Sequence, residues 1–193
     1  MSTGQTILTI GAFILLSNIL ITFYRLLAES GETINSSQSV ITAVSLATTN
    51  IQIAQGLHYD EKTINSFING QSELNRLTPL GLLGRDSWYG VDSLGNDTLE
   101  STPELPPENQ IKYFDDFDDF NGWEQRDTTL EGGIFKTTFL VYYVNPDNVS
   151  EPSLTQQTFV KRMDMKIWRE FPPSRDTLRT SFIMGYWMFS AAL

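Results

Sequence analysis

The first long stretch of the chain is apolar without interruption. Residues 6–24 read TILTIGAFILLSNILITFY and carry no charged side chain. A helix of this length rises about 28 Å at about 1.5 Å per residue, which is close to the hydrocarbon thickness of a bilayer. We therefore expect residues 6–24 to form a helix that is able to span a membrane.

Beyond residue 39 the apolar pattern continues on one side only. Apolar residues recur there at steps of three and four positions, which is typical of an amphipathic helix face. Gly31 and residues 35–37 are weak spots at which such a helix is able to bend or locally melt, and we expect the helix to end near Gly56. The predicted face consists of Val40, Ala43 or Val44, Ala47, Ile51 and Ala54.

The last third of the chain has the pattern of β-strands. Residues 134–144 are rich in β-branched and aromatic side chains, whereas residues 158–169 and 177–189 alternate between two faces. Turn-forming residues separate these segments, and short connections of this kind predict an antiparallel meander. One face of the second predicted strand consists of Phe159, Lys161, Met163, Met165 and Ile167.

These patterns predict an α+β protein. A long N-terminal helix, first hydrophobic and then amphipathic, is expected to pack on a C-terminal antiparallel β-sheet. Of the 193 residues, we assign 1–57 to the helix and 58–193 to a globular domain. That domain has an irregular, acidic region at 69–131, rich in Gly and Pro, and the β-meander at 134–189.

Charge and cysteine content narrow the function classes. The formal net charge is -10, and residues 86–131 hold thirteen Asp or Glu residues against Lys112 and Arg126. Nucleic acid is therefore excluded as an expected partner, because phosphate binding requires a basic surface. The chain has no cysteine, which excludes a disulfide framework and thiolate metal sites.

The order of these segments resembles that of type IV pilin-like proteins, which include pilins, minor pilins and secretion pseudopilins. The resemblance consists of a short polar start, an apolar helix that begins at once, its amphipathic continuation, an irregular region and a C-terminal sheet. By resemblance, a prepilin peptidase cuts after Gly4, and Gln5 becomes the new N-terminus. Most bacterial pilins have glutamate at the fifth position after the cut, where this chain has Thr9. If Met1 is kept, Gln5 itself occupies position five.

The resemblance implies that the chain polymerises through its N-terminal helix. Small and hydrogen-bonding residues in the apolar segment favour packing of helix against helix over packing against lipid. The alternative that remains open is a simple single-span anchor. The residues that we expect to serve assembly are Thr9, Gly11, Ala12, Ser17 and Asn18.

A second notable stretch, at residues 113–123, reads YFDDFDDFNGW. Closely spaced side chains with carboxylate or amide oxygens, which are hard ligands, suit Ca2+. Their spacing does not match that of an EF-hand loop. In a second interpretation the aromatic residues of this stretch, at three-residue steps, pack on the core and the aspartates face water. The two interpretations are compatible. The candidate metal ligands are Asp115, Asp116, Asp118, Asp119 and Asn121.

We predict no enzyme. His58 has no nucleophile partner in the sequence, and the glycine pairs lack the Lys of a phosphate-binding loop. By resemblance, the expected function is that of a structural subunit of an extracellular type IV pilus-like filament or a secretion pseudopilus. Its partners are other copies of itself or other pilin-like subunits, and residues 6–24 hold it in the inner membrane before it reaches the periplasm or cell surface. The alternative is a membrane-anchored extracytoplasmic module that binds glycans with Ca2+.

Overall fold

The computed structural model describes residues 3–63, 67–84, 110–130, 132–174 and 176–186. The chain divides into two compact units, Met1–Thr42 and Ala43–Leu193. The first unit is helical, and the second holds the end of the same helix together with the sheet. The last residues of the predicted third strand, 187–189, lie outside the described residues.

One helix, α1 (Thr3–Gln55), accounts for the described residues of the first unit and continues into the second. Gly31 and residues 35–37, the predicted weak spots, are helical in it, so the helix does not melt there. Hydroxyl groups in this region donate back to carbonyl oxygens one turn earlier, as Ser37 Oγ does to Thr33 O at 2.9 Å. The helix ends next to Gly56, as predicted, where Gly56 N–H donates to Ile53 O at 2.9 Å.

The C-terminal part of α1 buries a narrow stripe of alanines. Ala43, Ala47 and Ala54 are buried and belong to the same core as the sheet residues. Val40 was predicted to lie on the buried face, and this prediction was wrong because Val40 is 44% exposed. Of the two alternatives Ala43 and Val44, the buried one is Ala43, because Val44 is 46% exposed. An alanine stripe lets the helix backbone come close to the sheet, and valines beside the stripe point away from it.

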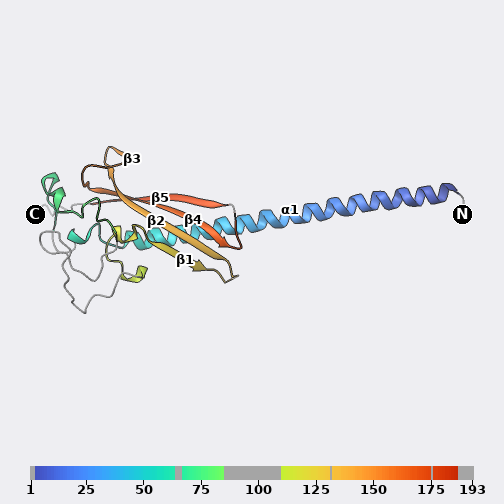
Figure 1. Cartoon of the computed structure of the whole chain (residues 1–193), viewed down its shortest axis with the longest axis horizontal. Helices are drawn as coiled ribbons and strands as arrows, with labels where there is room; N and C mark the ends of the chain where they lie inside the picture. Colours follow the sequence, from blue (N-terminus) through green and yellow to red (C-terminus); the bar gives the residue numbers. More distant parts are fainter. Residues whose placement is uncertain (1–2, 64–66, 85–109, 131, 175, 187–193) are drawn as a thin grey trace, which may run out of the picture. The chain divides into compact units, whose positions relative to one another are not determined.

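Five strands form one antiparallel sheet in the order β1-β2-β4-β5, with β3 paired to β2. Figure 1 shows β2, β4 and β5 side by side. The predicted meander is therefore confirmed in its three long strands. The strands are β1 (Glu124–Thr128), β2 (Ile134–Asn145), β3 (Asn148–Pro152), β4 (Val160–Phe171) and β5 (Thr177–Gly185).

The structure has two short strands that the sequence pattern did not predict. The sequence of β1, EQRDT, is polar, and β3, NVSEP, is exposed along its whole length. Neither strand has the apolar alternation that marks a half-buried strand, because each lies at the side of the sheet with little to bury. The hairpin between β2 and β3 turns at Pro146 and Asp147, inside the predicted turn.

The core lies between the alanine stripe of α1, the inner face of the sheet and the aromatic residues of the acidic stretch. Among the described residues the four 3-10 helices all precede β1, and the β3 hairpin lies between β2 and β4. Sheet residues of the core include Phe135, Phe139, Val141, Met163, Met165 and Ile167. The 3-10 helices are η1 (Glu61–Thr63), η2 (Gln71–Arg76), η3 (Ile111–Tyr113) and η4 (Asp118–Phe120).

Candidate functional site

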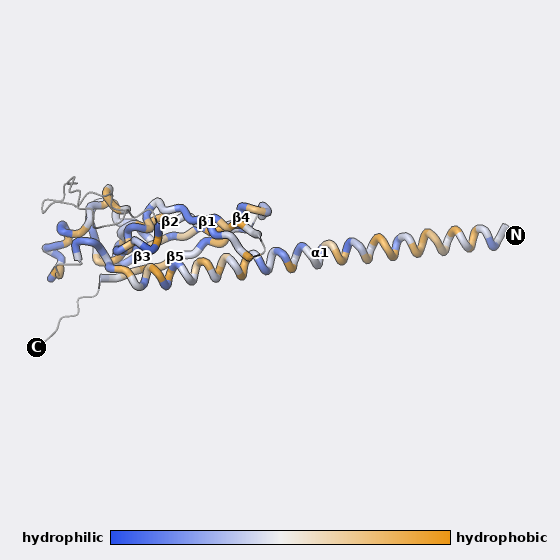
Figure 2. Tube along the Cα trace, turned by 90° about the horizontal axis from the view of Figure 1, so that it is seen from below, coloured by the Kyte–Doolittle hydropathy of each residue, from blue (hydrophilic) through white to orange (hydrophobic). Residues whose placement is uncertain are grey.

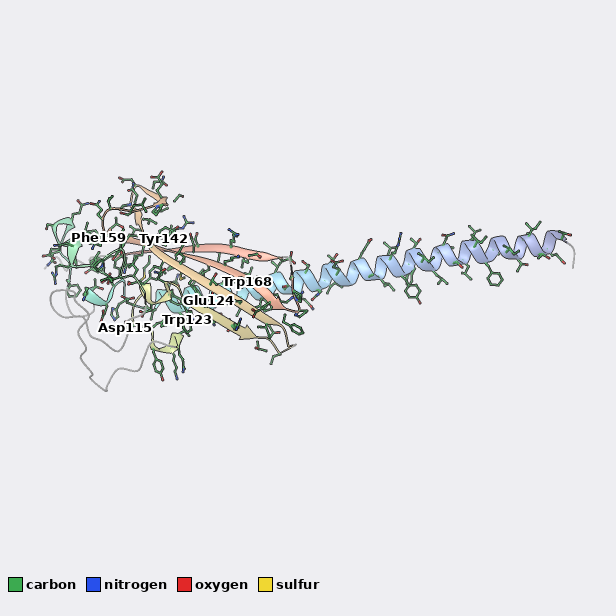
Figure 3. All side chains as sticks on the ribbon, viewed as in Figure 1. Asp115, Trp123, Glu124, Tyr142, Phe159 and Trp168 are labelled. Atoms are coloured by element: carbon green, nitrogen blue, oxygen red, sulfur yellow. The ribbon has the colours of Figure 1, made fainter. Side chains whose placement is uncertain are left out.

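The apolar segment of α1 exposes its side chains on every side. Leu8 and Phe13, for example, are 76% and 64% exposed. Figure 2 shows hydrophobic residues along the whole N-terminal part of α1, and Figure 3 shows side chains projecting from it in all directions. Among the described residues, α1 is the helix that is long and apolar enough to cross a membrane.

Polar side chains within the apolar segment hydrogen-bond to their own helix. Thr9 Oγ1 donates to Gln5 O at 2.8 Å, Asn18 Nδ2 to Ile14 O at 3.1 Å and Thr22 Oγ1 to Asn18 O at 2.9 Å. Each bond satisfies a side-chain donor without water. The segment is therefore compatible with an environment that offers few hydrogen bonds, such as lipid or the interior of a helix bundle.

The predicted processing and assembly residues all lie on this exposed part of α1. Gly4 and Gln5 lie in the first turns of the helix. A Cβ atom added at Gly4 or Gly11 would meet no atom of this chain within 4 Å. Ala12 and Ser17 are exposed as well. These residues all lie on one exposed helical segment, and their roles in cleavage and assembly stay predictions.

The aromatic residues of the acidic stretch pack into the core, as one interpretation predicted. Phe114, Phe117 and Phe120 are buried, and Trp123 is partly buried against them. The ring centres of Phe114 and Phe120 are 5.1 Å apart, and those of Phe114 and Trp123 are 5.4 Å apart, both in edge-to-face geometry. Figure 3 labels Asp115 and Trp123 near the two ends of this stretch.

The prediction that the aspartates face water was wrong for three of them. Asp116, Asp118 and Asp119 are only 3%, 2% and 2% exposed, whereas Asp115 is exposed. The three carboxyl groups are buried because the folded loop offers them hydrogen-bond donors. A buried carboxylate without such donors would cost several kcal/mol.

Backbone N–H groups of the loop turn toward these carboxyls. Asp116 accepts from Glu61 N at 2.6 Å, from Asp118 N at 2.8 Å and from Asp119 N at 3.2 Å. Asp119 in turn accepts from the N–H groups of Asp115 and Asp116, at 3.0 and 3.2 Å. The acidic run is thus a tightly bonded turn.

Two further contacts tie this turn to the rest of the domain. Asn121 Nδ2 donates to Leu83 O at 2.8 Å, and Asn121 Oδ1 accepts from Val141 N on β2 at 2.9 Å. The backbone of His58, just after α1, pairs with the turn through His58 N to Asp115 O and Phe117 N to His58 O. His58 therefore lies at a backbone junction.

The candidate metal ligands do not converge on a common point. Within the part of the chain that the structure describes, no group of three or more His, Cys, Asp or Glu side chains is arranged to hold a metal ion. Oxygens of Asp116, Asp119 and Asn121 accept backbone N–H groups instead. Calcium binding by residues 115–121 stays a prediction.

A buried lysine joins the turn to β4. The side chain of Lys161 is 0% exposed, and its Nζ donates to Asp60 Oδ2 at 2.8 Å and to Tyr59 O at 2.9 Å. It also donates to Asp118 Oδ1 in direct contact. The ammonium group therefore lies between two buried carboxyls, one from the segment after α1 and one from η4.

Asp60 receives several further hydrogen bonds. Thr78 donates to it from its backbone N–H and from its hydroxyl, both at 3.1 Å. Tyr143 OH on β2 donates at 3.2 Å, and Lys62 N donates at 3.1 Å. Asp60 is thus a buried carboxyl whose negative charge is well stabilised by donors.

Two tyrosines enclose the lysine. Its Nζ lies 4.7 Å from the ring centre of Tyr59 and 5.2 Å from that of Tyr143, distances at which a cation is attracted to an aromatic face. Tyr59 OH donates to Thr158 O at 2.7 Å. We refer to Tyr59, Asp60, Asp116, Asp118, Tyr143 and Lys161 as the Lys161 cluster.

If every group of the Lys161 cluster had its usual protonation state, three carboxylates would face a single ammonium. Burial raises the pKa of Asp116 well above its ordinary value, and the neighbouring Asp118 carboxyl raises it further. Burial likewise raises the pKa of Asp118, although Lys161 opposes this. Burial alone lowers the pKa of Lys161, but Asp118 and Asp60 outweigh it and raise that pKa. The cluster therefore retains a proton on its carboxyls beyond the usual pH range.

Sequence reasoning missed the Lys161 cluster as a site. One signal was visible, since Lys161 falls on the same predicted strand face as Met163, Met165 and Ile167, and that face is buried. A lysine on an apolar face requires a buried partner of opposite charge. Asp60 offered no comparable signal, because it lies in a loop far from β4 in the sequence.

Comparison with known proteins found no match. No protein-family model, no curated protein and no solved structure matches the chain. The chain has a long N-terminal helix that is apolar in its first half and contacts an antiparallel C-terminal sheet in its second.

Proposed function

We propose that the chain is a structural subunit of a pilin-like filament, either a type IV pilus-like fibre or a secretion pseudopilus. One observation carries this proposal. A helix whose exposed first part is apolar all round continues without a break into a helix that packs on a sheet domain. Such an element connects a membrane or a helix bundle directly to a folded domain.

The exposed apolar surface requires an occupant. Burying one large aliphatic or aromatic side chain contributes roughly 1.5–3 kcal/mol, and the segment carries many of them. Before assembly the occupant is lipid, and after assembly it is the same segment of neighbouring copies. The exposed large side chains of residues 6–24 are Ile7, Leu8, Ile10, Phe13, Ile14, Leu15, Leu16, Ile19, Leu20, Ile21, Phe23 and Tyr24.

Small residues in the segment support helix packing as the final state. Gly11, Ala12 and Ser17 lower the side-chain bulk, which lets two helix backbones approach closely. Small side chains give no comparable advantage to a helix that packs against lipid. The proposal therefore assigns the segment two successive environments, of which the second depends on these small side chains.

Larger side chains at these positions test the proposal. We expect Ala12→Leu combined with Ser17→Leu to abolish assembly while leaving membrane insertion intact, because both changes make the segment more apolar. The amount of chain in material sheared from cells is compared with the amount in the membrane fraction by immunoblotting. Ile14→Leu serves as the matched control, since it places leucine in the same segment without added bulk.

Assembly of the double variant at the level of the control would contradict packing through this face. A wild-type chain that stays in the membrane fraction and never enters sheared material would instead support an anchored extracytoplasmic binding module. In that case Ca2+ titration of residues 115–121 is the next measurement.

A further inference from the structure

The Lys161 cluster holds an amine and a carboxyl group in direct contact within the protein core. Lys161 Nζ contacts Asp118 Oδ1, and the two side chains are 0% and 3% exposed. The pair joins β4 to η4, two elements far apart in the sequence. Amine and acid condense to an amide when they are held together and water is excluded, because the entropic cost of their encounter has been met by folding.

We propose that Lys161 and Asp118 form an intramolecular isopeptide bond, an amide between Nζ of Lys161 and Cγ of Asp118. The site for this modification is the whole Lys161 cluster, which supplies a buried amine, an acceptor carboxyl in contact with it and a neighbouring carboxyl for proton transfer. The inference does not depend on the proposed function, since it concerns the globular domain alone.

Asp118 is a better acceptor than Asp60, although both contact the amine. Asp60 accepts hydrogen bonds from Thr78, Tyr143 and Lys62 as well as from Lys161, and these donors stabilise its carboxylate form. A well-stabilised carboxylate is a poor electrophile. Asp118 accepts the amine on Oδ1, and its backbone N–H donates to Asp116 Oδ1 at 2.8 Å. The Cγ atom of Asp118 is therefore more open to attack by Lys161 Nζ than the Cγ atom of Asp60.

The reaction balances without a further reactant. The Lys161 ammonium transfers one proton to the Asp118 carboxylate, which gives a free amine and a carboxylic acid. Nζ attacks Cγ and forms the N–C bond. Asp116 gives its proton to the departing hydroxyl, which leaves as water when its C–O bond breaks. Asp116 then takes one proton from Nζ, so that it ends as it began and the net products are an amide and one water molecule.

The surroundings of the pair suit this proton transfer. Asp116 is 3% exposed and lies beside the pair, since its Oδ1 accepts the Asp118 N–H at 2.8 Å. The rings of Tyr59 and Tyr143 lie over Nζ and exclude water. After reaction, Asp60 is placed to accept the amide N–H, because its Oδ2 already lies 2.8 Å from Nζ.

Such a bond would link the acidic turn covalently to the sheet. It closes a chain segment from residue 118 to residue 161, which lowers the conformational freedom of the unfolded chain in the manner of a disulfide. The chain has no cysteine with which to form a disulfide. The bond is therefore a cross-link of a kind that reduction does not break.

Mass spectrometry of the purified full chain in detergent tests the proposal. We expect the intact mass to lie one water molecule, about 18 Da, below the mass of the unmodified chain. Proteolysis is expected to yield one branched peptide that contains both Lys161 and Asp118. Lys161→Arg is expected to restore the full mass of its own sequence, and Asp116→Asn to reduce the linked species to a minor fraction.

Lys166→Arg is the matched control, because Lys166 lies on the same strand with its side chain exposed. It is expected to keep the loss of one water. Separate, unmodified peptides containing Lys161 and Asp118 in the digest of the folded wild-type chain would overturn the proposal. So would a water loss that maps to one peptide alone or a branched peptide that joins Lys161 to Asp60. Because the digest uses the wild-type chain, the test stands even if a variant fails to fold.

Discussion

At the residue scale, Lys161 determines how three separate segments meet. It lies on β4, and its partners come from the segment after α1 and from η4. The ammonium offsets carboxyls that are otherwise costly to bury. The position therefore links the acidic turn, the end of the helix and the sheet.

Removing the Lys161 side chain should be far more costly than removing a lysine on the surface. We expect Lys161→Met to lower the free energy of unfolding by about 3–5 kcal/mol, because Asp60 and Asp118 remain buried and lose the Lys161 nitrogen that contacts both, whether as an ammonium or as the proposed amide. The matched control is Lys166→Met, on the exposed face of β4, with an expected change within about 0.5 kcal/mol. Urea unfolding of each variant in the same detergent measures both. Equal losses in the two variants would contradict the role given to Lys161.

Asp116 makes stability depend on pH. Burial raises the pKa of Asp116 in the folded chain well above its ordinary value of 3.8, so folding takes up a proton when the pH exceeds that value. The contribution is fully present below the unfolded pKa and is lost as the pH rises through the folded pKa. Asp116→Asn should therefore make the decrease in unfolding free energy above pH 4 less steep.

The measurement is urea unfolding at a series of pH values. Asp147→Asn, on the exposed turn between β2 and β3, is the control and should leave the pH profile of the wild type unchanged. An Asp116→Asn profile that is parallel to the wild type would show that Asp116 does not take up a proton on folding.

At the scale of the elements, the contact between α1 and the sheet depends on small side chains. Ala47 is 5% exposed and packs in the same core as the phenylalanines of β2. Ala47→Leu forces extra volume into a packed site and should lower the free energy of unfolding by about 1–3 kcal/mol. Val44→Leu, on the exposed side of the same helix turn, should have little effect. Thermal unfolding of the two variants distinguishes them, and similar midpoints would mean that the helix does not pack tightly there.

The elements also show what sequence patterns are able to predict. The three long strands and the helix carry strong periodicity, and the structure has them at nearly the predicted bounds. β1 and β3 were missed because they are short and polar. The burial of Asp116 was missed because it depends on backbone N–H donors from Glu61 and η4, which no pattern along the chain reveals. Long-range partners such as Asp60 and Lys161 follow only from the fold.

At the scale of the whole molecule, the two units differ in the environment that they require. The second unit has a buried apolar core, whereas the large apolar residues of the first unit remain exposed. An exposed apolar surface of this extent marks a membrane or protein contact. We propose that other copies of the chain provide that contact.

The most direct test of that claim is negative-stain electron microscopy of material sheared from the cell surface, with mass spectrometry to identify the subunit and its N-terminal peptide. We expect thin filaments that contain this chain, and the N-terminal mass decides whether cleavage follows Gly4. Sheared material without filaments of this chain, together with an unassembled chain in the membrane fraction, would contradict it.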